Sequence, residues 1–344
     1  MSFDKQTTPP HNNRKRLIQR IAILLLLIVV GVGIYFGTQL WGVFAKTGKP
    51  LKKSTWRTEK VVLEEKDPFT VLLIGTDQRS TDPNNWRSDV LILAAVNPKT
   101  KSIKLISIPR DFYVKIANTE VRTKINAAAA YGRMKGIGEV ENIRQTVENI
   151  FHVPIDYYAK VNFQGFEDLV DALGGVDVNV KQRFKQRAIG GKMIVFEPGP
   201  RHLNGSEALA YVRNRKSFAE GDFARNERQR EVISQLIDKM TSIDGVTKFN
   251  EVTKAVGNNF DHSFHFKEIP SLIKTYREIP KERIETVTFE AYPKMYARSG
   301  SVVIIPKTEI QRLSQILHQQ LEYKPDDDMI NKTEGEEMEP PANR

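Results

Sequence analysis

The sequence contains no cysteine among its 344 residues. This absence excludes disulfide bonds, cysteine-ligated zinc and thiol catalysis. Histidine is also scarce: the six histidines are scattered, and His262 and His265 form the only close pair. Because this pair lies outside every motif described below, we expect both to be ordinary surface or core residues. We find no internal repeat and no convincing helix-turn-helix pattern.

Charged residues are absent from Ile21 to Phe44, where the chain is mostly apolar. A helix needs about 20 residues to cross a bilayer. The segment exceeds the core of a secretory signal peptide, about 7–15 residues, and no convincing small-residue cleavage site follows it. We therefore predict a transmembrane signal anchor at residues 21–44 after a basic tail at residues 1–20; a buried core helix is the alternative. Basic residues flank the segment on both sides, so the charge balance leaves its orientation open.

Basic residues outnumber acidic ones by 52 to 42, which gives a net charge of +10. The partner is therefore expected to be anionic: a nucleic acid, an acidic membrane surface or a phosphate-rich substrate. The length allows one large domain or two small ones. We predict a linker at residues 45–66, a folded domain at residues 67–323 and an acidic disordered tail at residues 324–344.

Three apolar runs rich in Val, Ile and Leu predict buried strands at Phe69–Ile74, Val90–Val96 and Ile103–Ile108. Further strands are predicted at residues 157–161, 176–180, 286–290 and 302–305. Helices are predicted at residues 139–151, 163–173, 204–213, 222–240, 246–256, 266–277 and 306–321, and residues 181–203 are expected to form a loop with a short hairpin. Strands alternating with helices indicate an α/β domain.

Charged residues stand at the ends of the three apolar runs, where an α/β sheet usually places its site. Asp77 and Asp89 are hard oxygen ligands, and Arg87 and Arg110 are cationic forks suited to phosphate. Two carboxylates with several arginines favour a divalent metal and a di- or polyphosphate. The alternative for each aspartate is a structural ion pair with a neighbouring arginine.

A second group of arginines lies between residues 211 and 230. On a helix, Arg225, Arg228 and Gln229 share one face, whereas Arg230 turns away and is expected to pair with Glu227 or Asp238. Arg213 and Arg215 fit a helix end, where both can reach one point. A solvated basic face is the alternative, but the preference for arginine over lysine favours bidentate oxyanion binding.

The order of motifs GTDQR, WRSDVLIL, SIPRD, KIN, HLNGSEALAYVRNRK and GDFARNERQR resembles the LytR-CpsA-Psr family of cell-wall ligases. The match runs from Phe69 to Lys239, with the signal anchor before it. The resemblance implies an α/β fold with a mixed central sheet flanked by helices, an αβα sandwich, and a hydrophobic pocket for a polyprenyl tail. It also implies a single-pass type II protein of the Gram-positive cell membrane whose catalytic domain is extracellular.

Each site residue can be carried over from the family by its position in these motifs. Asp77 and Asp89 match the metal-associated aspartates. The phosphate-binding arginines of the first half match Arg87 and Arg110. Those of the second half, with a glutamine, match Arg213, Arg215, Arg225 and Gln229. Lys124 and Arg228 are plausible additions to the diphosphate-binding set, and Asp222 fits its motif with an open role.

By resemblance, the protein transfers a phosphate-linked glycopolymer, wall teichoic acid in the first instance, from undecaprenyl diphosphate to the C6 hydroxyl of N-acetylmuramic acid in peptidoglycan. Mg²⁺ or Mn²⁺ near the two aspartates would bridge phosphoryl oxygens while arginines neutralise the rest. The sugar hydroxyl attacks the phosphorus that carries the polymer, undecaprenyl phosphate leaves, and Asp89 or Asp222 takes the proton.

Three other functions fit parts of the pattern. A pyrophosphatase that releases the lipid carrier would have the same site with water as acceptor. A membrane-tethered DNA-binding regulator fits the positive charge, but carboxylates alternate with the arginines and would repel a phosphate backbone, so we expect no nucleic-acid partner. A non-catalytic scaffold would bind without turnover.

Overall fold

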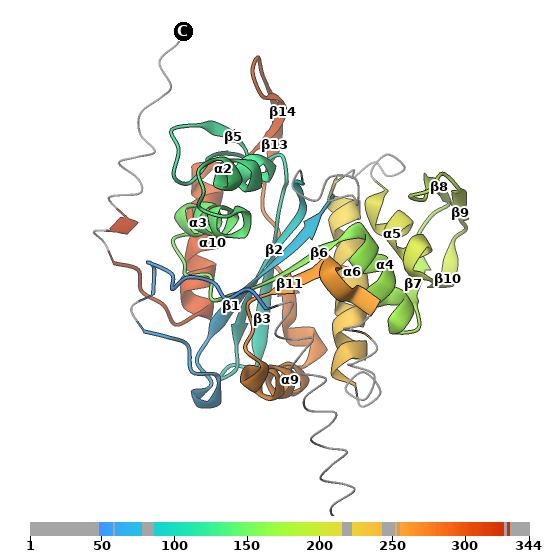
Figure 1. Cartoon of the computed structure of the whole chain (residues 1–344), viewed down its shortest axis with the longest axis horizontal. Helices are drawn as coiled ribbons and strands as arrows, with labels where there is room; N and C mark the ends of the chain where they lie inside the picture. Colours follow the sequence, from blue (N-terminus) through green and yellow to red (C-terminus); the bar gives the residue numbers. More distant parts are fainter. Residues whose placement is uncertain are drawn as a thin grey trace, which may run out of the picture. The chain divides into compact units, whose positions relative to one another are not determined.

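The computed structural model describes residues 48–57, 59–77, 86–214, 222–242, 252, 255–326 and 329–330, with backbone alone at residues 222–226, 258 and 266 (Figure 1). The predictions for the tail at residues 1–20, the anchor at residues 21–44, Arg215 and most of the acidic tail lie outside these residues. No helix in the described ranges is long and apolar enough to cross a bilayer.

A six-stranded mixed sheet forms the centre of the described fold (Figure 1). Its strand order is β11 (Phe260–His262), β6 (Tyr157–Asn162), β1 (Phe69–Thr76), β2 (Ser88–Asn97), β3 (Ser102–Ile108) and β12 (Ile284–Thr286). The strands β1, β2 and β3 run antiparallel in succession, while β6 is parallel to β1 and β12 to β3. The three predicted apolar runs are thus confirmed as neighbouring central strands.

Alternation along β1 to β3 directs side chains to two covered faces. On one face, residues such as Leu72, Leu93 and Ile106 are fully buried against helices α2 (Ala128–Met134), α3 (Glu139–Phe151) and α10 (Lys307–Gln320). On the other face, Phe69 and Val96 belong to a smaller core that includes residues of η1 (Leu63–Glu65) and α9 (Ile269–Glu278). The fold is therefore a mixed sheet between helices, as expected.

A second hydrophobic core lies beside the sheet and is built by α4 (Phe163–Ala172), α5 (Gly205–Arg213) and α6 (Asp222–Thr241) (Figure 1). These helices pack with β7 (Val176–Val180), β10 (Gly199–Leu203) and the hairpin of β8 (Phe184–Arg187) and β9 (Met193–Phe196). The helices predicted at residues 163–173, 204–213 and 222–240 are confirmed to within a few residues. This core contains Ala208 to Val212 of α5 with Val232 and Leu236 of α6, so it positions the two helices that carry the second arginine group.

Several short strands differ from the sequence prediction. The strand predicted at residues 286–290 is β12, at residues 284–286. The segment at residues 181–203 contains the predicted short hairpin, β8 with β9, and also β10, which was not predicted and pairs with β7. The sequence did not predict β4 (Tyr113–Lys115), β5 (Arg122–Lys124), β11 or β13 (Tyr292–Tyr296), which pairs with β14 (Gly300–Ile304). Such strands have three to five residues, too few for a hydrophobic period to register, and their neighbours define them.

Candidate functional site

Asp89 is the extra residue of a β-bulge at the start of β2. Gly75 of β1 pairs with Val90, but Thr76 pairs with Ser88, so Asp89 has no Cα partner on β1. A bulge re-aims the side chain that it inserts, and bulges are frequent beside active sites. The inserted carboxylate points across to the segment that follows β3.

Arg110 forms an ion pair with that carboxylate, and its Nη1 donates a hydrogen bond of 2.7 Å to Asp89 Oδ1. The guanidinium Nε also lies 3.5 Å from Asp111 Oδ2, and Lys124 Nζ lies 3.3 Å from Asp111 Oδ1. Burial opposes the charge on Arg110, but the hydrogen bonds and charges of Asp89 and Asp111 outweigh it and raise the pKa of Arg110. Asp111, for which the sequence predicted no role, thus links two of the predicted phosphate ligands.

The backbone of the KIN motif fixes the position of Arg110. The amide N–H of Asn126 donates to the carbonyl of Arg110 at 3.1 Å, and that of Ile125 donates to the carbonyl of Phe112 at 2.8 Å. Ile125 is fully buried in the main core. The motif therefore ties the loop after β3 to the core while Lys124 reaches the same cluster of charges.

Asp77 and Arg87 face each other across the ends of β1 and β2. Arg87 donates its backbone N–H to Asp77 Oδ1 at 2.7 Å, and the Asp77 N–H donates to the Arg87 carbonyl at 3.2 Å. The Arg87 side chain is exposed. The buried ring of Trp86 anchors this turn under Lys160, whose Nζ lies 4.9 Å from the ring centroid. The sequence did not predict this role of Trp86, because a lone tryptophan gives no periodic signal.

The carboxylates of Asp77 and Asp89 are of the ligand type that a hard divalent cation prefers. Each aspartate uses one carboxylate oxygen in the hydrogen bonds above. Thr76 and Ser88 are Cα partners, and the hydroxyl of each is buried without a hydrogen-bond partner in the described part of the chain. The same part contains no group of three or more His, Cys, Asp or Glu residues placed to hold a metal. A metal here would need phosphate or water oxygens to complete its coordination.

The second arginine group divides by environment. Arg228 is buried, donates from Nε to the Tyr211 carbonyl at 3.1 Å and from Nη2 to the Asn214 carbonyl, and lies over the Tyr211 ring. Gln229 is buried too and donates to the Val212 carbonyl at 3.4 Å. Both side chains thus satisfy the last carbonyls of α5, which no helical N–H can reach.

Arg213 ends α5, and its guanidinium lies 5.0 Å from the centre of the Phe163 ring. Asp222 and Arg225 lie in the first turn of α6, where the structure describes the backbone only. Binding of phosphate by Arg213, Arg225, Arg228 and Gln229 stays a prediction. Arg228 and Gln229 already have a structural role at the helix end.

Arg230 does not pair with either carboxylate that the sequence suggested. Its Nη1 instead lies 3.4 Å from the Ser107 hydroxyl of β3, so the side chain faces the central sheet. Glu227 forms an ion pair with Lys181 at 2.8 Å, and Asp238 forms one with Lys281 at 2.6 Å. The prediction for Arg230 was therefore wrong: a helical wheel gives an angle around the helix but does not say which element lies there.

The motif before Arg213 builds the start of α5. Asn204 caps the helix: its side chain accepts from the Glu207 N–H at 2.9 Å, and the Asn204 N–H donates to the Glu207 carboxylate at 3.3 Å, which completes a capping box. A Cβ on Gly205 would lie 2.3 Å from the Glu167 carbonyl oxygen of α4. These residues of the motif therefore position α5 and do not belong to the cluster of charges.

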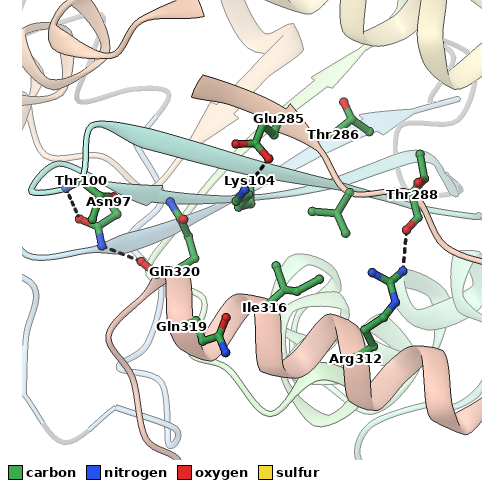
Figure 2. Close-up of a pocket in the computed structure, with 11 residues that line it drawn as sticks. Asn97, Thr100, Lys104, Glu285, Thr286, Thr288, Arg312, Ile316, Gln319 and Gln320 are labelled. Atoms are coloured by element: carbon green, nitrogen blue, oxygen red, sulfur yellow. Dashed lines mark hydrogen bonds and ion pairs between the residues drawn. The ribbon is translucent and has the colours of Figure 1, made fainter. Parts of the chain in front are cut away.

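A polar cavity of about 460 Å³ lies at the opposite end of the sheet (Figure 2). Its lining includes Asn97 at the end of β2, the Lys104–Glu285 ion pair, and Arg312 and Gln320 on α10. These groups already bond to one another or to nearby backbone, as the dashed lines in Figure 2 mark. The cavity contains no predicted site residue, so we place the candidate site at the Asp89 end.

Comparison with known proteins agrees with this arrangement. The model of the LytR_cpsA_psr family matches residues 38–319. The chain belongs to this family. It is 34% identical over 323 residues to the polyisoprenyl-teichoic acid–peptidoglycan teichoic acid transferase TagV of Bacillus subtilis (strain 168), covering 91% of this chain and 81% of that protein. It is 38% identical over 268 residues to TagU of the same strain, covering 77% and 83%.

Solved structures of the LytR_cpsA_psr family have the same fold. The crystal structure of B. subtilis TagV matches with a TM-score of 0.65 at 34% identity, over 76% of this chain and 99% of that one. A structure described as TagT bound to LIIa-WTA matches with a TM-score of 0.64 at 31% identity, over 80% of this chain and 99% of that one. The mixed sheet and its flanking helices are therefore those of the family.

Proposed function

We propose that this chain is a phosphotransferase that moves a phosphate-linked anionic glycopolymer, wall teichoic acid in the first instance, from an undecaprenyl diphosphate carrier to peptidoglycan. The observation that carries the proposal is the cluster of Asp89, Arg110, Asp111 and Lys124 at one end of the sheet, with Asp77 and Arg87 beside it. The transferase names of its relatives, each about a third identical, support the same reaction class.

In this mechanism, Arg110, Arg87 and Lys124 bind the diphosphate and neutralise charge on its oxygens. Arg110 is already oriented by Asp89, so little reorganisation is needed when phosphate arrives. An incoming phosphate oxygen competes with Asp89 for the guanidinium. Asp89 then becomes available to accept the proton of the acceptor hydroxyl.

A divalent cation, Mg²⁺ or Mn²⁺, when bound by Asp77 and Asp89, would supply further positive charge against the phosphoryl oxygens. The unpartnered hydroxyls of Thr76 and Ser88 support this assignment, because buried oxygens without hydrogen-bond donors suit a cation. Arg110, Arg87 and Lys124 orient the diphosphate. Asp222 remains the alternative proton acceptor.

The acceptor we propose is the C6 hydroxyl of N-acetylmuramic acid. We also propose that the uncharged segment at residues 21–44 anchors the protein in the cell membrane as a single-pass type II protein with an extracellular catalytic domain. A lipid-linked donor supports this location, because its phosphates stay at the membrane surface. Protease shaving of intact cells that removes a C-terminal tag but leaves an N-terminal tag would support this topology; the reverse pattern would reject it.

The decisive experiment incubates the full-length chain in detergent with an undecaprenyl-diphosphate-linked teichoic acid precursor, uncrosslinked peptidoglycan and Mg²⁺. Mass spectrometry then searches for polymer joined to glycan. Joined product that disappears with Arg110→Ala and with EDTA supports the proposal. Release of carrier without joined product would instead establish the pyrophosphatase, and salt-sensitive DNA binding without lipid turnover would establish the regulator.

A further inference from the structure

Arg230 is a partly buried arginine in the middle of α6 whose side chain reaches the central sheet. Its Nη1 donates across to the Ser107 hydroxyl on β3 at 3.4 Å. Within the described residues, no carboxylate lies at ion-pair distance from this guanidinium. The guanidinium therefore places a positive charge beside the sheet, and no described carboxylate neutralises it by direct contact.

Such a charge is costly to bury without a partner. Burial lowers the pKa of Arg230 from its ordinary value, and the charge of Glu227 offsets this only in part. Glu227 itself pairs with Lys181, and Asp238 pairs with Lys281 and accepts from the Tyr276 hydroxyl. A bound anion would supply the counter-charge that the described residues do not provide.

The sheet surface beside Arg230 is apolar. Ser107 pairs with Ile92, and Ile92 with Leu73, so the three side chains form one row on one face. Val90 and Leu105 lie next to this row on the same face. Leu73, Val90 and Leu105 remain partly exposed although they belong to the three central strands. Leu105 also packs against the smaller core around Phe69 and Val96, so the apolar row continues that core toward Ser107.

The geometry also relates this surface to the candidate site. Ser107 lies three residues before Arg110, and Val90 directly follows Asp89. Opposite Val90 stands Gly75, where a Cβ would lie only 2.9 Å from the Val90 Cβ. Arg230 thus stands where the apolar surface meets the cluster of charges.

We propose that Arg230 binds the phosphate that carries the prenyl chain, which is the leaving group of the transfer. This inference rests on the proposed function. An amphiphile whose chain lies on Leu73, Val90 and Leu105 would bring its own phosphate to Arg230, while the polymer-bearing phosphate meets Arg110. The guanidinium then faces the oxygen on which charge develops.

The step balances without another reactant. The acceptor hydroxyl oxygen forms a bond to the polymer-bearing phosphorus, and the bond from that phosphorus to the bridging oxygen breaks. The electron pair stays on the prenyl phosphate oxygen, where Arg230 stabilises it, and the hydroxyl proton passes to a carboxylate. Arg230 keeps its protons throughout.

Binding of the product tests this role independently of turnover. The full-length chain in detergent is titrated with undecaprenyl phosphate and, separately, with undecaprenol, which lacks the phosphate. For Arg230→Gln we expect affinity for undecaprenyl phosphate to fall about tenfold to hundredfold, with affinity for undecaprenol unchanged. Arg230→Lys should recover part of the loss, because it restores the charge without the fork.

Asp238→Asn is the matched control, because it weakens a different link between α6 and the rest of the fold. It should leave both affinities unchanged. Equal loss of both ligands in Arg230→Gln, or unchanged binding of undecaprenyl phosphate, would overturn the inference. Transfer with no sensitivity to Arg230→Gln would also overturn it while leaving the proposed function intact. Arg230-dependent phosphate binding in a chain that performs no transfer would support the inference and reject the function.

Discussion

Asp89 holds Arg110 from the neighbouring strand, with 2.7 Å between Oδ1 and Nη1. The contact depends on the bulge, because Asp89 is the residue that β1 leaves unpaired. The two residues are partly buried, so solvent weakens their attraction less than it would at an exposed surface. The pair therefore keeps a guanidinium oriented at the end of the sheet until an anion displaces the carboxylate.

Arg110→Ala should lower single-turnover transfer at least about a hundredfold, since it removes a preorganised charge that faces the transferred phosphate. Asp89→Asn should also lower transfer, and the double variant should be less impaired than the product of the two effects, because the residues act as a unit. Rapid-quench measurement of joined glycan tests this. Arg183→Ala, which breaks an exposed arginine–glutamate pair on the second core, is the control and should leave the rate unchanged. Multiplicative losses would show that the two residues act separately.

Arg228→Ala should destabilise the fold by roughly 2–4 kcal/mol, because it leaves the Tyr211 and Asn214 carbonyls without their buried donor. Urea unfolding followed by tryptophan fluorescence measures this. Arg187→Ala is the matched control: its guanidinium also donates to a carbonyl, that of Gly191, but at an exposed position. Its effect should stay within about 0.5 kcal/mol. Equal effects for the two variants would contradict the structural role of Arg228.

Gly205→Ala should destabilise the chain by about 1–3 kcal/mol, because the new Cβ would overlap the Glu167 carbonyl and force α4 and α5 apart. Helix propensity alone predicts the opposite sign, since alanine favours a helix over glycine. Thermal unfolding distinguishes the two. Ser206→Ala, one residue further along the helix, serves as the control. A gain in stability at position 205 would mean that the two helices do not pack this closely.

His262 should make the fold sensitive to acid. Burial lowers its pKa to about 4, against a weaker opposing effect of Asp261. The folded state therefore favours the neutral ring: the contribution is complete above the unfolded pKa of about 6.5 and is lost as pH falls toward 4, up to about 3 kcal/mol. His262→Gln should flatten this part of the stability profile. Denaturant titrations at pH 7.5, 5.5 and 4.5 measure it, and parallel profiles for wild type and variant would refute the assignment.

The central strands and their charged ends could be predicted from sequence for a definite reason. A strand buried on both faces is apolar at nearly every position, so its run stands out and its ends coincide with the first charges. Asp77, Asp89 and Arg110 were found in this way, and the structure brings Asp89 and Arg110 together. The shorter strands β4, β5, β11 and β13 carry no such signal, because three to five residues acquire their pairing from neighbours.

The partners of the second arginine group could not be predicted from the sequence. Arg228 and Arg230 are two residues apart and chemically identical. The helical period separated their directions, but it led to the expectation that Arg230 pairs with Glu227 or Asp238. In the fold Arg228 meets the carbonyls at the end of α5, and Arg230 meets Ser107 on β3.

The sequence by itself thus determined which segments are buried, where the charged residues interrupt them and which family they resemble. Those properties depend on local composition and order. The tertiary structure alone decided that Asp89 is a bulge residue, that Asp111 links Arg110 to Lys124, and that Arg230 faces the sheet. Each of these depends on strand register or on which element lies opposite a side chain, and residues far apart in the chain determine both.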